Sequence, residues 1–271
     1  MVMKFINRIK LAITDTPVIE VIANIFYYGA PNFVNKRFID NSIYILLYHE
    51  VIRENFEDII ELKDKGFSFI TYEQMVNCLS SNKMPPPRSI VITFDDGLRS
   101  IFTEAYPVIM KEHIPIMVFL ISNFLFRIDT SVPNNGRSYL SLDETKELYK
   151  TGLVAFGSHT MSHPCLTDIS LINASAEIVN SKKRLEQELG FEIKHFSYPY
   201  GGPSTYSKNH IRVLSESGYK SAVTNIAGVN SLKTSIYELK RVRVHEKQSV
   251  KSIQLLMSGV LHKLIGSWKG D

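Results

Sequence analysis

The 271-residue chain has few of the features that mark disulfide-bonded, nucleic-acid-binding or membrane-spanning proteins. Its two cysteines, Cys78 and Cys165, lie in unrelated segments without a metal-binding Cys-x-x-Cys spacing, so they require no oxidising compartment. The formal net charge is only +4, and no stretch interleaves basic and aromatic residues, so we predict no nucleic-acid partner. No uninterrupted apolar run approaches the roughly 18 residues of a membrane span.

The amino-terminal segment is basic and apolar, but it lacks the features of a cleavable signal peptide. Asp15, Pro17 and Glu20 interrupt its apolar stretch, and no small-x-small cleavage site follows. Its apolar residues recur with helical period, which predicts a helical extension over residues 1–38 ahead of a main domain at residues 39–271. The extension either packs on that domain or makes peripheral contact with a membrane as an interfacial helix, so cytoplasmic and membrane-peripheral locations both stay open.

Predicted strands and helices alternate along the main domain. Apolar runs with strand character lie at residues 42–48, 89–92, 115–120, 153–156 and 221–224, with helical segments between them. This alternation favours an α/β fold with a parallel sheet or barrel, and a hydrophobic content of 44% suffices for one large core. In such barrels the functional side chains collect at the carboxyl ends of the strands.

Two adjacent carboxylates, Asp95 and Asp96, follow the apolar run at residues 89–92 and precede Gly97. Consecutive side chains on a strand point to opposite sides, but a glycine turn at the strand end lets both reach one cavity. Two carboxylates at one site suit a division of labour in which one binds a metal and the other takes a proton. A plain Asp-Asp-Gly turn is the alternative, and the dipeptide alone favours it.

Two histidines, His159 and His163, follow the predicted strand at residues 153–156. Pro164 biases His163 away from helical geometry, and a loop with two imidazoles can close around an ion. Two histidines and one aspartate form a standard ligand set for Zn²⁺ with one position open for water, and Co, Ni or Fe also fits it. Two surface histidines in a polar loop are the alternative. The histidine pair and the Asp-Asp pair, both at strand ends of one domain, favour a metal site more strongly together than either does alone.

Three ordered motifs resemble those of the polysaccharide deacetylases, the NodB-type members of carbohydrate esterase family 4. They are TFDDG at residues 93–97, SHTMSH at residues 158–163 and FSYPYG at residues 196–201. The resemblance extends from about residue 44 to about residue 244. It implies an irregular (β/α)7-type barrel for the main domain, which would then be a polysaccharide deacetylase catalytic domain.

The resemblance also implies roles for individual residues. Asp95 would be the general base. The implied metal ligands are Asp96, His159 and His163. The implied substrate-binding residues are Tyr198, Pro199, Tyr200 and Gly201. A backbone N–H near Tyr200 would help the metal to stabilise the oxyanion.

Protonation of the leaving amine needs an acid, and the chain contains eight histidines. In many family members the acid histidine follows the other motifs, which points to His245. Leu-Tyr-His at residues 47–49 is instead similar to the poly-N-acetylglucosamine deacetylase subgroup, in which this histidine comes first, so we prefer His49. A structural His49 bonded to a carboxylate is the alternative. Other histidines, including His195, lack such a motif context.

The chain departs from the family pattern at two positions. Ser197 stands where many relatives carry an arginine that holds the base carboxylate. Arg241 can supply that charge from another strand, although an exposed strand cation is the alternative reading. The tryptophan that often lines the acetyl pocket is also missing, because the single tryptophan is Trp268.

The sequence therefore predicts a metal-dependent hydrolase of the N-acetyl group on an amino sugar resembling GlcNAc. The substrate would be an N-acetylated polysaccharide or glycolipid, and the reaction would release acetate. Cleavage of another non-peptide carbon–nitrogen bond, or of an O-acetyl ester, is an alternative enzymatic function. A non-catalytic glycan-binding relative is the alternative from another class of protein.

Overall fold

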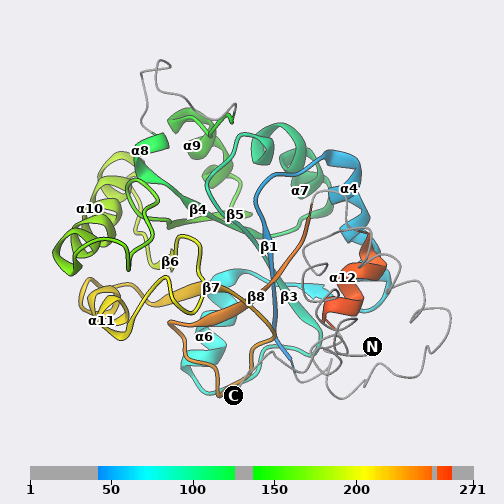
Figure 1. Cartoon of the computed structure of the whole chain (residues 1–271). Helices are drawn as coiled ribbons and strands as arrows, with labels where there is room; N and C mark the ends of the chain where they lie inside the picture. The colour runs from blue at the N-terminus through cyan, green and yellow to red at the C-terminus, as the bar shows by residue number, and fades with distance from the viewer. Residues whose placement is uncertain (1–41, 126–136, 246–248, 258–271) are drawn as a thin grey trace, which may run out of the picture.

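A computed structural model of the chain describes residues 42–125, 137–245 and 249–257. The predicted extension at residues 1–38 and Trp268 lie outside these ranges. The described part is built on a parallel sheet of eight strands that curls into a barrel (Figure 1). The strands are β1 (Tyr44–Tyr48), β2 (Ser68–Phe69), β3 (Ser89–Phe94), β4 (Ile116–Leu120), β5 (Val154–Ser158), β6 (His195–Ser197), β7 (Ser221–Ala227) and β8 (Leu239–Arg243).

Pairing between β1 and β3 closes the barrel. Strands β3 to β8 pair in chain order, β8 pairs with β1, and β1 pairs with β3 along its whole length from Tyr44 to Tyr48. The short β2 pairs with Ser89 and Ile90 at the start of β3, and β4 pairs with the rest of that strand. Seven parallel strands thus form the ring, with β2 beside it, which confirms the predicted irregular (β/α)7-type barrel.

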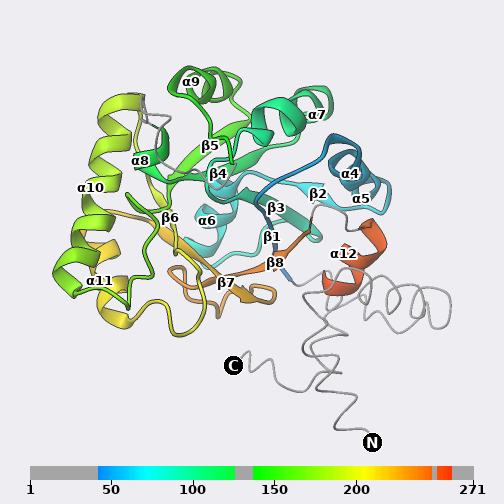
Figure 2. The same cartoon turned by 45° about the horizontal axis from the view of Figure 1, so that its top comes forward.

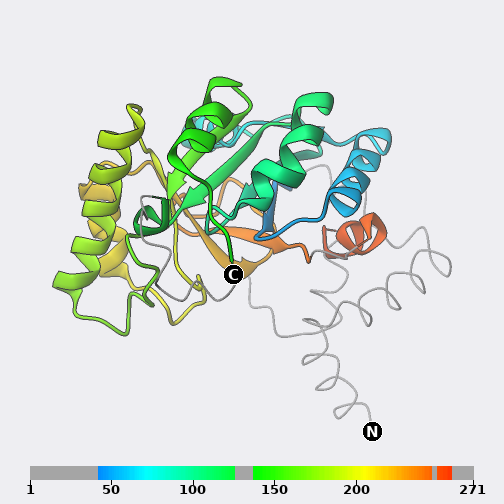
Figure 3. The same cartoon turned by 90° about the horizontal axis from the view of Figure 1, so that it is seen from above.

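Helices surround the ring of strands (Figure 2). They are α4 (Arg53–Glu57), η2 (Asp58–Ile60), α5 (Glu61–Asp64), α6 (Tyr72–Ser80), the π-helical η3 (Ile101–Ala105), α7 (Tyr106–Glu112), α8 (Ser122–Leu125), α9 (Leu142–Lys150), α10 (Leu171–Leu189), α11 (Lys208–Glu216) and α12 (Val250–Met257). Figure 3 shows α12 beside α4 and α5, where the Lys65 ammonium donates to Gln254 Oε1 at 3.0 Å. Within the described ranges, no helix is both long enough and apolar enough to cross a membrane.

Alternation along the strands divides the apolar residues into two cores. On β3, Ile90, Ile92 and Phe94 face outward and belong to the larger cluster beneath the helices. Val91 faces inward and belongs to a second cluster inside the barrel. Helix α6 contributes three buried residues to this inner cluster, namely Tyr72, Met75 and Val76. The apolar inner cluster fills the amino-terminal half of the barrel, and α6 packs over that end, which leaves the carboxyl end for polar side chains.

Candidate active site

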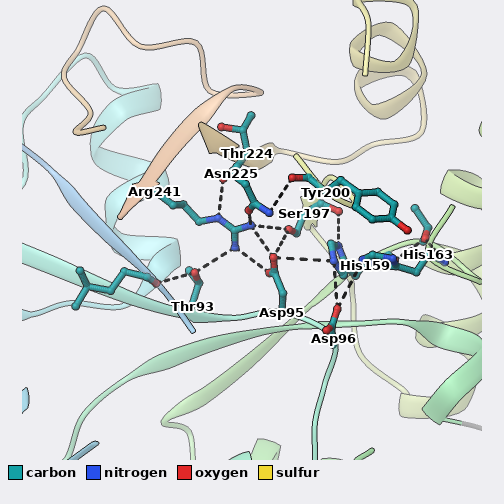
Figure 4. Close-up of polar contacts among 12 residues, drawn as sticks. Thr93, Asp95, Asp96, His159, His163, Ser197, Tyr200, Thr224, Asn225 and Arg241 are labelled. Atoms are coloured by element: carbon teal, nitrogen blue, oxygen red, sulfur yellow. Dashed lines mark hydrogen bonds and ion pairs between the residues drawn. The ribbon is translucent and has the colours of Figure 1, made fainter. Parts of the chain in front are cut away.

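Polar side chains continue the inward register of the strands at the carboxyl end of the barrel. Because side chains alternate, residues two positions beyond an inward apolar residue face inward again. On β3 this register leads from Val91 through Thr93 to Asp95, and on β8 it leads from Leu239 to Arg241. The same rule places His49, His159 and Ser197 on the inward side of their strands. Figure 4 shows four of these side chains converging: Asp95, His159, Ser197 and Arg241.

A left-handed turn brings the two adjacent aspartates to one centre. Asp96 has φ 70° and Gly97 has φ 74°, and aspartate tolerates this region better than most residues with a side chain. Asp95 Oδ2 lies 3.9 Å from Nε2 of His159, and Asp96 Oδ1 lies 3.6 Å from the same nitrogen (Figure 4). The turn therefore overcomes the alternation that separates neighbouring side chains on a regular strand.

Asp96, His159 and His163 have the donor set and the spacing of a metal site. Their ligand atoms all lie within 4.8 Å of one another. Asp96 Oδ1 is 3.6 Å from Nε2 of His159 and 3.7 Å from Nε2 of His163, which is too long for hydrogen bonds. Ligands bound at about 2.1 Å to one tetrahedral ion lie about 3.4 Å apart. The three residues thus fit a divalent transition ion with one coordination position left open.

Both imidazoles are in a state that suits metal binding. The Ser197 carbonyl lies 2.7 Å from Nδ1 of His159 and can only accept, so Nδ1 donates to it and Nε2 is the ring nitrogen that faces Asp96. Burial, together with the neighbouring His159, lowers the pKa of His163 to about 4. His163 is therefore neutral at pH 7, and neutral imidazole is the form that binds metal ions.

Asp95 forms a buried bidentate ion pair with Arg241. The Nη1 atom donates to Oδ1 at 2.8 Å and Nη2 donates to Oδ2 at 2.6 Å, and both side chains are almost fully buried. The Ser197 hydroxyl donates to Oδ2 at 3.2 Å. Burial alone would raise the pKa of Asp95, but the charge and hydrogen bonds of Arg241 more than offset it and hold this pKa well below its usual range. Asp95 is therefore ionised at neutral pH.

The guanidinium of Arg241 is held on every side. Its Nε donates to the Thr224 carbonyl at 2.7 Å, and Nη1 donates to the Thr93 hydroxyl at 3.3 Å. Its Nη2 donates to the Ser197 hydroxyl at 3.1 Å and to Asn225 Oδ1 at 2.5 Å. Because Arg241 is only 1% exposed, the alternative reading as an exposed strand cation is wrong.

The segment from Tyr198 to Gly201 turns across the mouth of the barrel. The Tyr198 ring is buried in the outer core, so only its backbone can face the site. Pro199 is also buried. Tyr200 is 59% exposed, and its ring lies edge-on to His163, with 5.0 Å between ring centroids. The exposed Tyr200 ring therefore lies beside the candidate metal ligand His163.

Gly201 brings this segment against β7. Its φ of 58° is left-handed, and a Cβ at this position would lie 2.4 Å from the backbone nitrogen of Asn225. Asn225 Nδ2 donates to the Tyr200 carbonyl at 2.9 Å. Asn225 therefore links the exposed tyrosine to Arg241, whose guanidinium it also binds.

The two candidate acids leave neighbouring strands at the same rim. His49 is half-buried directly after β1. Burial lowers the pKa of His49, and the charges of the two site aspartates partly offset that effect. His245 is half-buried after β8, and the preceding Val244 N–H donates to the Leu47 carbonyl at 2.9 Å. The charges of both site aspartates therefore act on His49, the preferred candidate.

Two contacts of the site were not predicted. Asn225 directly follows the predicted strand at residues 221–224, and this strand-end position was the available signal. The Arg137 guanidinium lies 3.5 Å from Asp96 Oδ2, and a bridge between Leu98 and Tyr139 brings its segment there. That contact joins segments far apart in the chain, so local sequence carries no sign of it.

Comparison with known proteins identifies the family. The sequence profile described as polysaccharide deacetylase matches residues 82–222, just over half of the chain. The chain therefore belongs to the polysaccharide deacetylase family. The expectation of a hydrolase that acts on non-peptide carbon–nitrogen bonds is confirmed at the level of this family.

Two curated relatives show the range of similarity. YxkH of Bacillus subtilis strain 168 is 27% identical over 209 residues, which cover 74% of this chain and 70% of that protein. The poly-beta-1,6-N-acetyl-D-glucosamine N-deacetylase of Staphylococcus epidermidis is 32% identical over 162 residues, which cover 56% of this chain and 54% of that enzyme. The match thus spans about half the length of the second relative.

Solved structures share the fold. The Streptococcus pyogenes deacetylase PplD, in complex with acetate, matches with a TM-score of 0.71 at 24% identity, covering 80% of this chain and 98% of that one. IcaB from Ammonifex degensii matches with a TM-score of 0.68 at 23% identity, covering 80% and 96%. At these identities the likeness establishes the barrel fold alone.

Proposed function

We propose that the protein hydrolyses the N-acetyl group of a GlcNAc-like amino sugar in a polysaccharide or glycolipid and releases acetate. The observation that carries this proposal is the buried, ionised Asp95 beside the donor set of Asp96, His159 and His163. The Staphylococcus epidermidis relative is named for deacetylation of poly-beta-1,6-N-acetyl-D-glucosamine, which supports an amino-sugar substrate.

Asp96, His159 and His163 would hold a divalent ion, and Zn²⁺ is the first candidate ahead of Co, Ni or Fe. Such an ion supplies Lewis-acid polarisation of the acetyl carbonyl and acidifies water. The chain's own contribution is to orient the ligands. The Ser197 carbonyl accepts from Nδ1 of His159 and so orients its ring, and Oδ1 of Asp96 lies within 3.7 Å of Nε2 of both imidazoles.

Asp95 takes the proton of the attacking water in this proposal. The bidentate pair with Arg241 fixes the plane of the carboxylate and keeps it ionised. Arg241 is thus a positioning residue for the base. The same pair weakens Asp95 as a base, so the carboxylate does not keep the proton. In this proposal the proton passes to His49, which has given its own proton to the departing amine.

His49 gives a proton to the departing amine, with His245 as the alternative donor. Burial lowers the pKa of His49, so its protonated form is a stronger acid than ordinary imidazolium.

The backbone N–H of Tyr200 is the candidate oxyanion donor, because the Gly201 N–H already donates to the Pro199 carbonyl at 2.7 Å. The exposed Tyr200 ring offers a face for the sugar. The helical extension at residues 1–38 and its membrane contact remain predictions.

Acetate release from N-acetylglucosamine oligomers, with metal analysis of the same preparation, tests the proposal. We expect acetate release with one ion bound per chain, loss of activity after chelation, and recovery when Zn²⁺ is restored. Preferential release from O-acetylated sugars would identify an esterase instead. A full complement of metal without acetate release from any N-acetylated glycan would favour a glycan-binding protein.

A further inference from the structure

One carboxylate from α10 holds the loop that joins the two histidine ligands. Glu177 Oε2 accepts hydrogen bonds from the Met161 N–H at 2.8 Å and from the Ser162 N–H at 2.9 Å. Its Oε1 accepts a hydrogen bond from the Ser162 hydroxyl at 2.7 Å. Hydrogen bonds to an ionised acceptor are stronger than those between neutral groups, so this carboxylate is a firm anchor for the middle of the loop.

The loop needs an anchor because its backbone is unfavourable at both sides of the anchored residues. Thr160 has φ 67° and His163 has φ 63°, although a β-branched threonine avoids the left-handed region. Such conformations persist only where surrounding contacts enforce them. The Thr160 hydroxyl accepts from the His163 N–H at 3.0 Å, and the Thr160 carbonyl accepts from the Ser122 N–H at 3.1 Å. Glu177 completes this set of bonds from the helix side.

We infer that Glu177 is a positioning residue for the metal centre. By fixing Met161 and Ser162, it holds the loop in the conformation that directs Nε2 of both histidines toward one oxygen of Asp96. This inference rests on the proposed function, because it requires that the two histidines bind an ion. Groups that orient metal ligands without touching the metal commonly contribute about 10- to 100-fold to its affinity.

The same helix provides a matched control. Glu186 Oε1 accepts a hydrogen bond from the Ile193 N–H at 3.0 Å and from the Lys182 ammonium at 2.8 Å. It is therefore also a glutamate of α10 that anchors a loop backbone. The loop that it anchors leads to β6 and contains none of the three ligands.

The test compares Glu177→Gln and Glu186→Gln in the full chain. Zn²⁺ affinity is measured by competition with a chromophoric chelator, coordination by the absorption spectrum of bound Co²⁺, and folding by thermal unfolding without metal. We expect Glu177→Gln to lower the Zn²⁺ affinity by about 10-fold or more and to change the Co²⁺ spectrum. Glu186→Gln should lower the unfolding temperature without changing either metal readout.

Ser162→Ala is the milder variant if Glu177→Gln does not fold, because it removes one of the three bonds to the carboxylate. We expect a smaller loss of Zn²⁺ affinity in the same direction. Wild-type Zn²⁺ affinity and an unchanged Co²⁺ spectrum in Glu177→Gln would overturn this inference but not the proposed function. An equal loss of Zn²⁺ affinity in Glu186→Gln would do the same. A wild-type chain that binds neither ion would overturn the proposed metal chemistry as well.

Discussion

Two clusters at opposite ends of the barrel each combine a buried histidine with a carboxylate, and their hydrogen bonding differs. At the amino end, His195 Nδ1 lies 2.9 Å from the Ser221 hydroxyl and Nε2 lies 2.8 Å from Glu73 Oε2. The Tyr72 hydroxyl lies 2.9 Å from the same serine. At the carboxyl end, Nε2 of His159 has carboxylate oxygens only at 3.6 and 3.9 Å among the described residues. The first cluster is saturated, whereas the second leaves a ring nitrogen for a ligand.

The backbone conformation also differs between the two clusters. Asp96, Thr160, His163 and Tyr200 all have positive φ values around the carboxyl-end site. The residues of the amino-end cluster occupy regular positions at the start of β6, β7 and α6. Strained backbone persists where function requires it, so it separates the two clusters as clearly as hydrogen bonding does. A buried histidine beside a carboxylate is therefore no sign of a catalytic site unless its nitrogens remain open.

Asp95→Asn should have the largest effect on activity of any change that keeps the metal site. Asparagine retains a carbonyl oxygen for Arg241 but cannot take a proton from water, so we expect kcat to fall by about 10²- to 10⁴-fold. Metal content should stay at the wild-type level, because Asp95 is not among the three ligands. Acetate release and metal analysis check both statements. Loss of the ion in this variant would contradict the assignment of Asp95 as base and Asp96 as ligand.

Arg241→Met tests how far the carboxyl-end cluster depends on its buried ion pair. Removing one partner of a buried pair leaves an uncompensated charge, so we expect the free energy of unfolding to fall by about 3–5 kcal/mol. Arg99 forms a comparable 2.8 Å pair with Glu144, but its side chain is 55% exposed. Arg99→Met should therefore cost about 1 kcal/mol or less. Urea denaturation measures both variants, and equal losses would show that burial of the Arg241 pair has no special weight.

Much of this architecture was predictable from local sequence. Alternation of strands and helices indicated a parallel sheet or barrel, and the resemblance of the motifs indicated the barrel and Asp95, Asp96, His159 and His163 as neighbours. Closure of the barrel by the pairing of β1 with β3 could not be predicted from local sequence, because it depends on the arrangement of the whole ring of strands.

The side chains that hold Asp95 show the same limit of prediction from local sequence. Arg241 was a candidate because of its charge, but its burial became evident only when β8 was placed beside β1 and β7. For His195, by contrast, the sequence context predicted no functional role, and both of its ring nitrogens have hydrogen-bond partners away from the candidate active site. Side chains that act through long-range pairing carry no local signal, whereas ligands clustered at strand ends do.

His49→Gln should lower kcat/KM by about 10²-fold if His49 protonates the amine, and His245→Gln should then have little effect. Because burial lowers the pKa of His49 below its ordinary value of 6.5, the proton needed for catalysis is lost at a lower pH than usual. We therefore expect kcat/KM of the wild type to decrease as pH rises through this pKa. A pH–rate profile checks the direction. An ascending limb that disappears in His49→Gln would instead mean that neutral His49 takes the proton from water.

His195→Gln should lower stability and leave catalysis intact, so it tests the difference between the two clusters most directly. Loss of its two hydrogen bonds should lower the free energy of unfolding by about 1–3 kcal/mol, with kcat and metal content unchanged. Burial lowers the pKa of His195 in the folded protein below its ordinary value of 6.5. The unfolded chain then binds the proton first as pH falls, so stability decreases below about pH 6.5.

Other buried histidines contribute in the same direction, so the useful quantity is the difference between wild type and His195→Gln. The variant should flatten the dependence of unfolding free energy on pH by at most about 1.4 kcal/mol per pH unit, which corresponds to one proton. Urea denaturation between pH 5 and pH 8 measures this slope. If the variant lost acetate release at unchanged metal content, the amino-end cluster would be part of the active site, and saturation of hydrogen bonds would no longer separate a structural histidine from a functional one.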